Sequence, residues 1–460
     1  MYALSSSSGG FMESVIKLKL NLDEESRQVI EGQSRICNWL YNNLLQQANQ
    51  LREQYRETQS QDIAKTLYTK RGLRNLIPEM KKEHPFLRTV HSSPMKNVGL
   101  RVSESIQAYQ QTRKGKRKGN QTGWPRFRSN KVKPFSLLYD EPNKGFKLDG
   151  KKLRLSLGSS EKGKRLYVEG SVEKSLQEFS DVEIRQLRIK EELGQFFAIF
   201  TVKRPDPSPK TTQPRKIIAL DPNHKNLSWG VDLEGVSTEI RNPWFMKQLQ
   251  KRINQVKSKR DKCEKKSTLC TTEQGKEYWK PSRRWVYLDR ILNRLHWQRR
   301  EQTKAFIYGV AHFLYRRYDL VSIGNYTPLF LRAGTGLTRN MKREMFNQSL
   351  IGRLKKTLEW VAKKSGKQFM EWDEYCSTKT CSYCQHQLVV SLQPSVRKWE
   401  CPSCSRNLIR DENAARNGLM RTLESIKESS PGSGHLGEIS SRCTVRFDGL
   451  GFHTVLSGVC

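Results

Sequence analysis

The sequence predicts an α/β domain in the C-terminal half of the chain, preceded by a helical region and a small β-domain. Buried strand segments at KIIALDP (216–222) and YDLVSIGNYTP (318–328) alternate with amphipathic helical segments, an order typical of a mixed sheet covered by helices. Short apolar–polar alternation fills residues 134–205 and favours strands, whereas apolar residues recur at helical spacing between residues 23 and 113.

The N-terminal half begins with ESVIKLKLNL (13–22), whose alternation predicts a strand with one buried face. The helical pattern runs from Asp23 to the basic segment TRKGKRKGNQTGWPRFRSN (112–130), where glycine and proline interrupt it. The strands of the β-domain follow. PDPSPKTTQPRK (205–216) is rich in proline and threonine, which is typical of a linker.

In the C-terminal half, LSWGVDLEG (227–235) is the expected hairpin partner of the strand that ends at Asp221. A long basic helical stretch follows, with an interruption near Cys263–Thr272. A later amphipathic helix ends at Gly366, and KQFMEWDEY (367–375) predicts a strand. A last helix is expected from Asn413 to about Glu428, and the Gly- and Ser-rich residues 429–460 are expected to be disordered.

The composition points to a polyanionic partner. The 460 residues include 83 Lys and Arg against 46 Asp and Glu, which gives a formal net charge of +37. Such a charge repels itself in an isolated globule, and nucleic acid is the partner that neutralises it best. The N-terminus has no export signal, and the sequence contains no run of about 18 apolar residues, the length that is needed to cross a membrane. An intracellular protein with no membrane partner is therefore expected.

Four of the ten cysteines form two Cys-x-x-Cys pairs. Cys381, Cys384, Cys401 and Cys404 match the spacing of a zinc ribbon, in which four thiolates complete a tetrahedron and leave no position for water. A structural zinc ion is therefore predicted. Cys376 lies nearby but would be a fifth ligand, so we leave it out of the site.

Two aspartates mark a candidate catalytic site. Asp221 stands at the C-terminal end of a buried strand, where α/β sheets collect ligands. Asp411 follows the second cysteine pair in RDENAARN (410–417), at the start of a helix, where a carboxylate is often only a cap. Two carboxylates in one cleft repel each other unless divalent metals neutralise them, and two Mg²⁺ ions suit phosphodiester hydrolysis.

Basic residues interleaved with aromatic ones are the expected nucleic-acid contacts, the cations for phosphates and the aromatic rings for base stacking. A solvated charged face is the alternative. One set lies between the helical region and the β-domain, and consists of Lys114, Lys116, Arg117, Lys118, Trp124, Arg126, Phe127 and Arg128. The other lies on the long basic helix, and consists of Arg283, Arg284, Arg290 and Arg294, continued by Arg299 and Arg300, with Trp285 and Trp297 between them.

The chain resembles the TnpB family of transposon-encoded RNA-guided nucleases, which is related to the type V CRISPR effectors and to Fanzor proteins. The residues that carry the resemblance are GWPRFRS (123–129), IALDPN, NQSLIGRLKKTLEWVAKKSG (347–366), TKTCSYC, WECPSC and RDENAARN, within residues 13–425. The resemblance implies an RNase H-like RuvC domain with an inserted zinc ribbon, and an N-terminal β-domain with an inserted helical lobe. Asp221 then corresponds to the first catalytic acid of the family and Asp411 to the third.

The domain boundaries expected on this basis are a flexible leader at 1–12, a wedge-like β-domain at 13–22 and 123–205, a helical recognition lobe at 23–122, a linker at 206–215, a RuvC-like domain at 216–428 with its zinc ribbon at 376–410, and a disordered tail at 429–460.

The second acid departs from the family pattern. The family places a glutamate at the end of the central strand, where this chain has Gly324 and Asn325. Glu374, shortly before the first cysteine pair, is the expected replacement, as in the Fanzor proteins that the chain resembles. Glu371 is a rival, and Asp373 is expected to point the other way along an alternating strand. If no replacement exists, the nuclease is inactive.

The sequence thus predicts an Mg²⁺-dependent, RNA-guided DNA endonuclease with Asp221, Glu374 and Asp411 as metal ligands. Guide RNA and double-stranded target DNA are the expected partners of a monomer or weak dimer, in the cytoplasm of a prokaryote or the nucleus of a eukaryote. Two alternatives remain. One is a nuclease-inactive RNA-guided DNA-binding protein, and the other is a transposase or a transposition accessory protein.

Overall fold

The computed structural model divides the chain into two compact units, Met1–Asp206 and Pro207–Cys460. It describes residues 11–117, 119–130, 133–160, 163–176, 182–207, 213–272, 275, 277–325, 349–390, 392–393, 395–427, 438–448 and 451–457. Within these residues, no helix combines the length and the apolar character that crossing a bilayer requires.

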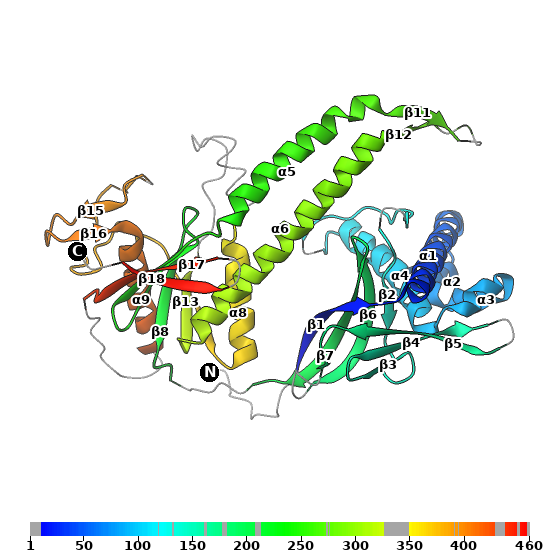
Figure 1. Cartoon of the computed structure of the whole chain (residues 1–460), viewed down its shortest axis with the longest axis horizontal. Coiled ribbons are helices and arrows are strands. Elements are labelled where there is room, and N and C mark those ends of the chain that lie inside the picture. The colour runs from blue at the N-terminus through cyan, green and yellow to red at the C-terminus, as the bar shows by residue number, and fades with distance from the viewer. Residues whose placement is uncertain are drawn as a thin grey trace. The chain divides into compact units, whose positions relative to one another are not determined.

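The N-terminal unit is built on a seven-stranded sheet of order β2-β6-β7-β1-β5-β4-β3, in which all neighbours are antiparallel (Figure 1). Its strands are β1 (Phe11–Asn21), β2 (Leu137–Tyr139), β3 (Phe146–Asp149), β4 (Lys152–Ser159), β5 (Arg165–Val172), β6 (Glu183–Glu192) and β7 (Gln195–Pro205). Every second residue of β1 from Met12 to Leu20 is buried, which is the alternation that the sequence predicted. The first strand in the sequence therefore lies inside this sheet.

A helical segment joins β1 to β2. It consists of α1 (Glu24–Thr58), α2 (Gln61–Tyr68), η1 (Leu73–Leu76), α3 (Ile77–Glu83), η2 (Pro85–Thr89) and α4 (Ser92–Arg113). The Asp23 side chain caps α1 by accepting from the Ser26 amide at 2.7 Å. Buried residues of α1 and α4, such as Leu40, Leu44, Val98 and Ile106, share one core with the sheet.

The C-terminal unit is built on a mixed seven-stranded sheet of order β14-β13-β8-β9-β10-β17-β18. Its strands are β8 (Ile217–Pro222), β9 (Ser228–Asp232), β10 (Val236–Ile240), β13 (Leu320–Gly324), β14 (Gln368–Trp372), β17 (Ser441–Phe447) and β18 (Phe452–Ser457). Strands β8, β13 and β14 are parallel, so their C-terminal ends lie at one edge of the sheet. The protein is an α/β protein in this unit, as predicted.

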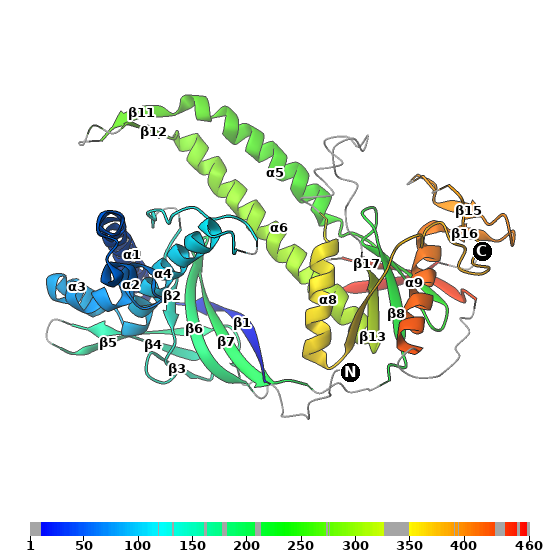
Figure 2. The ribbon, with the colours of Figure 1, turned by 180° about the vertical axis from the view of Figure 1, so that it is seen from behind.

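Helices cover both faces of this sheet (Figure 2). Helix α9 (Arg410–Lys427) packs with Ala415 and Leu419 on the face that carries Ile217 and Ala219. The opposite face, with Ile218, packs against α5 (Phe245–Lys262), α6 (Arg283–Tyr315) and α8 (Ile351–Ser365). We call the first side the α9 face of the sheet. Gly366 ends α8 with a φ of 62°, as the sequence predicted.

Helices α5 and α6 form a helical hairpin that ends in a short β-hairpin (Figure 1). The β-hairpin pairs β11 (Thr268–Thr271) with β12 (Glu277–Lys280), and a short turn η4 (Glu264–Lys266) precedes it. The predicted interruption of the basic helical stretch is therefore present.

The prediction that residues 429–460 are disordered is wrong for most of that segment. Strand β17 pairs in parallel with β10, and β18 pairs with β17 at the edge of the sheet. Glycine and serine dominate residues 429–437 and hid the alternation of TVRF (444–447), whose strand buries Cys443, Thr444 and Val445. Residues 429–437, 449–450 and 458–460 lie outside the described residues, as do most of the expected leader, residues 1–10, and residues 208–212 of the expected linker.

Candidate active site and metal-binding ribbon

Three carboxylates gather at the C-terminal edge of the parallel strands. Asp221 lies near the end of β8 and is 6% exposed, and Asp411 lies in the first turn of α9 and is 5% exposed. Glu374 follows β14 by two residues. The charges of Glu374 and Asp411 both raise the pKa of Asp221, so the three side chains lie within electrostatic reach of one another.

Glu374 fills the space in front of Gly324, where the family pattern would place its acid. A Cβ atom added to Gly324 would lie 1.9 Å from Glu374 Oε1 and 2.5 Å from its Cδ. Any side chain at position 324 would therefore displace this carboxylate. On β8, Asp221 continues the series Ile217 and Ala219 that faces α9, and Gly324 belongs to the same face because Ser322 bonds Thr422 of α9 at 2.7 Å.

Asn325 holds the segment that carries Glu374. Its backbone amide donates to Trp372 O at 2.9 Å and its side-chain oxygen accepts from the Glu374 amide at 3.1 Å. Its Nδ2 donates to Asp373 Oδ1 at 3.2 Å, so Asp373 serves in the turn. On α9, Arg421 donates to the Asp373 carbonyl. The two residues that break the family pattern thus provide room for Glu374 (Gly324) and a support for it (Asn325).

Glu371 lies on the other side of the sheet. Its carboxylate forms an ion pair with Lys355 of α8 at 2.7 Å, and α8 covers the face opposite α9. Glu371 therefore does not point toward Asp221.

The pKa of Asp221 is raised, first because the carboxyl is desolvated by burial, and second because of the Glu374 and Asp411 charges. The Arg410 and Arg397 charges oppose this effect. A buried acid that repels two neighbouring acids favours a bound cation. Oxygen ligands suit Mg²⁺, and carboxylates distributed around a cleft fit two ions about 3.5–4 Å apart. The residues present therefore fit a magnesium site.

Asp411 is held by cationic side chains. Arg397 Nη1 donates to Asp411 Oδ2 at 2.8 Å, and Arg410 Nη2 lies 3.2 Å from Oδ1. Asn223 Nδ2 donates to Oδ2 at 3.4 Å. The Asp411 carboxylate therefore contacts side chains from the segment before α9 and from the loop after β8, which a residue that only capped the helix would not need to do.

Replacing Asp221 with asparagine should stabilise the metal-free chain. Because the folded-state pKa is raised, the ionised carboxyl lowers the free energy of unfolding, and stability falls as the pH rises through that pKa. Below the unfolded-state pKa, Asp221→Asn and the parent should melt alike. At pH 7 to 8 without added Mg²⁺ or Mn²⁺, and with the structural zinc retained, the variant should melt a few degrees higher, where about 1 kcal/mol corresponds to about 2–4 °C. Equal melting temperatures from pH 4 to pH 9 would contradict the assigned environment.

The four predicted cysteines converge. Their sulfur atoms all lie within 4.8 Å of one another, with Cys381 and Cys404 at 3.7 Å and Cys384 and Cys401 at 3.5 Å. A tetrahedral zinc ion with bonds of about 2.3 Å requires sulfur separations of about 3.8 Å, so this cluster can bind zinc. Among the described residues it is the one group of three or more Cys, His, Asp or Glu ligands gathered this tightly.

Two matching turns form the cluster. The Cys381 amide donates to His386 O at 2.8 Å, and the Cys401 amide donates to Arg406 O at 2.9 Å. The second turn joins β15 (Lys398–Glu400) to β16 (Asn407–Ile409), and α9 begins directly after β16. We call residues 376–410, which carry the four cysteines, the metal-binding ribbon. Because α9 begins where this ribbon ends, the ribbon positions Asp411 in the first turn of the helix.

Replacing Cys381 with serine should abolish stoichiometric zinc binding and loosen the start of α9. Structural zinc contributes about 10–16 kcal/mol of apparent binding free energy in small zinc domains, so the ribbon should not fold without it. Metal analysis together with hydrogen exchange at residues 377–413 measures both effects. The matched control is Cys376→Ser, because Cys376 lies outside the four-cysteine cluster and should leave the zinc content at one per chain. Loss of zinc from both variants would contradict the assignment.

Two buried asparagines join the ribbon to α9, and the sequence analysis did not assign them a role. Asn413 and Asn417 lie one helical turn apart and are 2% and 4% exposed. Both side-chain nitrogens donate to Thr380 O at 2.7 Å and to Ser377 O. They fix the segment between Glu374 and Cys381. The signal in the sequence was an Asn pair at i, i+4 spacing in RDENAARN.

Several predicted nucleic-acid contacts are engaged inside the N-terminal unit. Trp124 donates to Asn49 Oδ1 at 2.8 Å, meets Tyr109 edge-on, and has Arg52 4.2 Å from its ring centroid. Arg128 lies near the Phe135 ring at 5.2 Å, and its backbone amide donates to Asn42. Both residues therefore have structural contacts that base stacking or phosphate binding would disturb.

Other members of that set face solvent. Phe127 is 60% exposed, and Lys114, Lys116 and Arg126 are exposed, whereas Arg117 is half-buried and donates to Asn120 O at 2.9 Å. Lys118 lies outside the described residues. On α6, Arg283, Arg284, Arg290 and Arg294 are exposed, as a nucleic-acid face requires and as a solvated face also would be.

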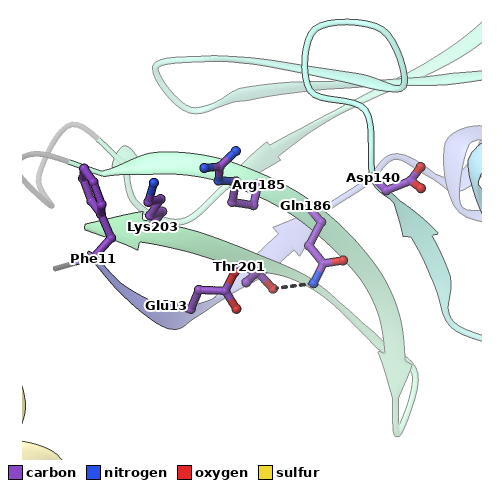
Figure 3. A pocket seen from close by; sticks show the side chains of 7 residues that line it. All are labelled: Phe11, Glu13, Asp140, Arg185, Gln186, Thr201 and Lys203. Carbon is purple, nitrogen blue, oxygen red and sulfur yellow. Dashed lines mark hydrogen bonds between the residues drawn. The ribbon is translucent and has the colours of Figure 1, made fainter. Parts of the chain in front are cut away.

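A cavity of about 510 Å³ lies on the open side of the N-terminal sheet (Figure 3). The Lys203 ammonium lies 3.6 Å from the centroid of the Phe11 ring, and Gln186 donates to Thr201 at 3.1 Å. Its charged lining is balanced between acids, Glu13 and Asp140, and bases, Arg185 and Lys203. Nothing in this lining favours a polyanion over any other ligand.

Comparisons with known proteins show which families this chain is similar to. The family model for the TNB domain of Cas12f1-like proteins matches residues 352–418, which include Glu374, the four cysteines and Asp411. Three TnpB-like proteins of Acanthamoeba polyphaga mimivirus are each 31% identical over 169 residues, which is 36% of this chain and 31% of each relative. The match thus spans about a third of the length of these relatives.

Among solved structures, a Cas12f1–sgRNA–target DNA complex contains a chain of similar fold. The TM-score is 0.54 at 11% sequence identity, over 86% of this chain and 82% of that chain. At this identity the likeness concerns the fold alone.

Proposed function

Because the chain is related to the TnpB-like proteins and the type V effectors, we propose that it is an RNA-guided DNA endonuclease with a RuvC-like site formed by Asp221, Glu374 and Asp411. The observation that carries this proposal is the Glu374 carboxylate in front of Gly324. A site without a second acid would be a poor ligand set for two metals, and Glu374 supplies that acid from the segment that follows the neighbouring strand β14.

The chain's own residues would act in the following way. Magnesium at this site would activate water and stabilise the leaving oxygen of a phosphodiester. Asp221 would hold the metals on the rigid β8, and Asp411 would do so from the ribbon side. Glu374 would complete the set, oriented by Asn325. The zinc ribbon would fix the start of α9, and base pairing with a guide RNA would choose the target.

The test is cleavage of plasmid DNA by the purified full chain with RNA transcribed from the DNA that flanks its gene. We expect cleavage with a matching guide in Mg²⁺, and none in EDTA, with a mismatched guide, or with Asp221→Asn. Guide-dependent DNA binding without cleavage in Mg²⁺ or Mn²⁺ would contradict the proposal. It would favour a nuclease-inactive RNA-guided DNA-binding protein.

One observation favours that second candidate. Arg397 and Arg410 both bind Asp411, so the carboxylate is neutralised without a metal. Mn²⁺ binding to the full chain tests this reason for inactivity, because a protein in which the arginines replace the metal should bind no ion at Asp221 and Asp411.

A further inference from the structure

A second cavity, of about 450 Å³, opens beside Asp411 on the α9 face of the C-terminal sheet. Its lining includes Trp229, Arg241 and Arg397, together with Lys225, Lys247 and Asp411 itself. The residues come from the loop after β8, the strands β9 and β10, the start of α5 and the metal-binding ribbon. We call it the Lys225–Lys247 groove.

The strand register connects this groove with the catalytic acids. Trp229 of β9 stands opposite Asp221 of β8 on one side and opposite Glu239 of β10 on the other. Residues directly opposite each other project to the same face of a sheet, so these three side chains form one row. The Trp229 indole donates to Ser237 Oγ at 2.7 Å, which fixes its ring in the row.

The charges in the groove are unequal. Glu239 is neutralised by Arg241 at 3.0 Å, and it also accepts from Asn226 at 2.5 Å. Asp411 is neutralised by Arg397 and Arg410. Lys225 and Lys247 are exposed, and neither forms an ion pair with any part of the chain that the structure describes. The cavity that Asp411 lines therefore carries a net positive charge, which comes from Lys225 and Lys247.

A fixed indole ring beside surplus lysines matches the chemistry of a single nucleic-acid strand, whose bases stack on aromatic rings while cations bind its backbone. The volume also falls in the range of about 300–1,000 Å³ that is typical of ligand pockets. The Arg397 side chain is 34% exposed, and it lines the groove while it pairs with the Asp411 carboxylate. Its guanidinium binds phosphate oxygens as well as carboxylates.

We propose that the Lys225–Lys247 groove binds the backbone of the DNA strand to be cut, and that Arg397 exchanges the Asp411 carboxylate for a phosphate of that strand. This proposal rests on the proposed function. Before a strand binds, Arg397 competes with metal for Asp411. After the exchange, Arg410 still pairs with Oδ1 of Asp411, but the Oδ2 atom that Arg397 held becomes available to the metal, so strand binding and metal binding strengthen each other.

The first experiment measures binding of a short fluorescent single-stranded DNA to the full chain with its guide RNA, in Ca²⁺. The double variant Lys225→Ala/Lys247→Ala should bind about tenfold more weakly than the parent. The salt dependence should lose about 0.7 per lost phosphate contact. Lys225→Arg/Lys247→Arg should restore binding. The matched control is Lys363→Ala, an exposed lysine of α8 on the opposite face of the sheet, which should bind as the parent does.

The second experiment measures Mn²⁺ binding to the full chain by electron paramagnetic resonance. Arg397→Gln should bind Mn²⁺ several-fold more tightly than the parent without DNA, and the difference should shrink when the strand is added. Unchanged Mn²⁺ affinity in Arg397→Gln would overturn the exchange.

Unchanged DNA affinity in the double variant would overturn the groove, even where guided cleavage is present and the proposed function holds. A loss confined to single-stranded RNA would assign the groove to the guide and overturn the proposal as well. If both binding effects are found but no cleavage occurs, the proposal on the groove stands and the proposed nuclease function fails.

Discussion

Replacing Glu374 with glutamine is expected to leave guide and target binding intact and to slow DNA cleavage by more than about 100-fold. Even residues that only support a metal ligand cost about 10–100-fold when changed, and Glu374 is proposed as a ligand itself. The measurement is a single-turnover cleavage rate in Mg²⁺. The matched control is Glu371→Gln, which removes a carboxylate three residues away on the opposite face of the sheet and should cleave like the parent.

Gly324 offers a sharper form of the same prediction. In Gly324→Ala, the new Cβ would meet the Glu374 carboxylate at 1.9 Å, so the acid remains in the chain but has to move. Cleavage should fall although no carboxylate is lost. In Gly324→Glu/Glu374→Ala, the acid returns to the central strand, and part of the cleavage lost in Glu374→Ala should return. Full cleavage by Gly324→Ala, or by Glu374→Gln, would remove Glu374 from the site.

The sequence was informative where a structural feature depends on residues that are close together in the chain. The continuous apolar runs in KIIALDP and in YDLVSIG predicted β8 and β13, because a strand that is buried on both faces leaves no polar alternation in the sequence. The spacing of the four cysteines predicted the cluster, since two short turns supply all four ligands. Glu374 was predicted from the resemblance to Fanzor proteins, which carry a relocated glutamate shortly before the cysteines. Its position in front of Gly324 depends on the parallel pairing of β13 with β14, which a single sequence does not reveal.

Contacts between distant segments are the main features of the site that the sequence did not predict. The pairing of Arg397 with Asp411 joins residues 14 apart through the second turn of the ribbon, and no local pattern indicates it. Trp124 and Arg128 were predicted as nucleic-acid contacts, and nothing in the local sequence indicates that both also have hydrogen-bond partners within the N-terminal unit. Their partners, Asn49 and Asn42, come from α1, more than 70 residues earlier.

The C-terminal strands were missed for a related reason, and they lead to the other large prediction. Deleting residues 438–460 is expected to lower the melting temperature by about 10 °C or more and to abolish cleavage. The deletion removes the parallel partner of β10 and opens that sheet edge. It also removes the partly buried Phe447 and Phe452, whose rings lie 5.6 and 5.9 Å from Phe306 of α6, and full burial of one phenylalanine would contribute about 1.5–3 kcal/mol.

An ion pair links these strands to the helical turn that carries Asp411, one of the proposed catalytic acids. Arg442 of β17 donates through Nε and Nη2 to the two carboxylate oxygens of Glu412 at 2.8 and 3.0 Å, and Glu412 is the neighbour of Asp411. Arg442→Ala should cost about 1.5–3 kcal/mol, because it leaves a nearly buried carboxylate without its charged partner. Arg446→Ala, an exposed arginine on the same strand, should cost little.

The two effects of Arg442→Ala can be separated by comparing rate with stability. If Arg442 only stabilises the fold, cleavage well below the melting temperature should match the parent. If it positions the first turn of α9, cleavage and Mn²⁺ affinity should both fall at that temperature, and Arg442→Lys should restore only part of them because a single ammonium does not reproduce two parallel hydrogen bonds. We expect the second result, since Glu412 and Asp411 share the first turn of α9, which follows the metal-binding ribbon, and a shift of one residue moves the other.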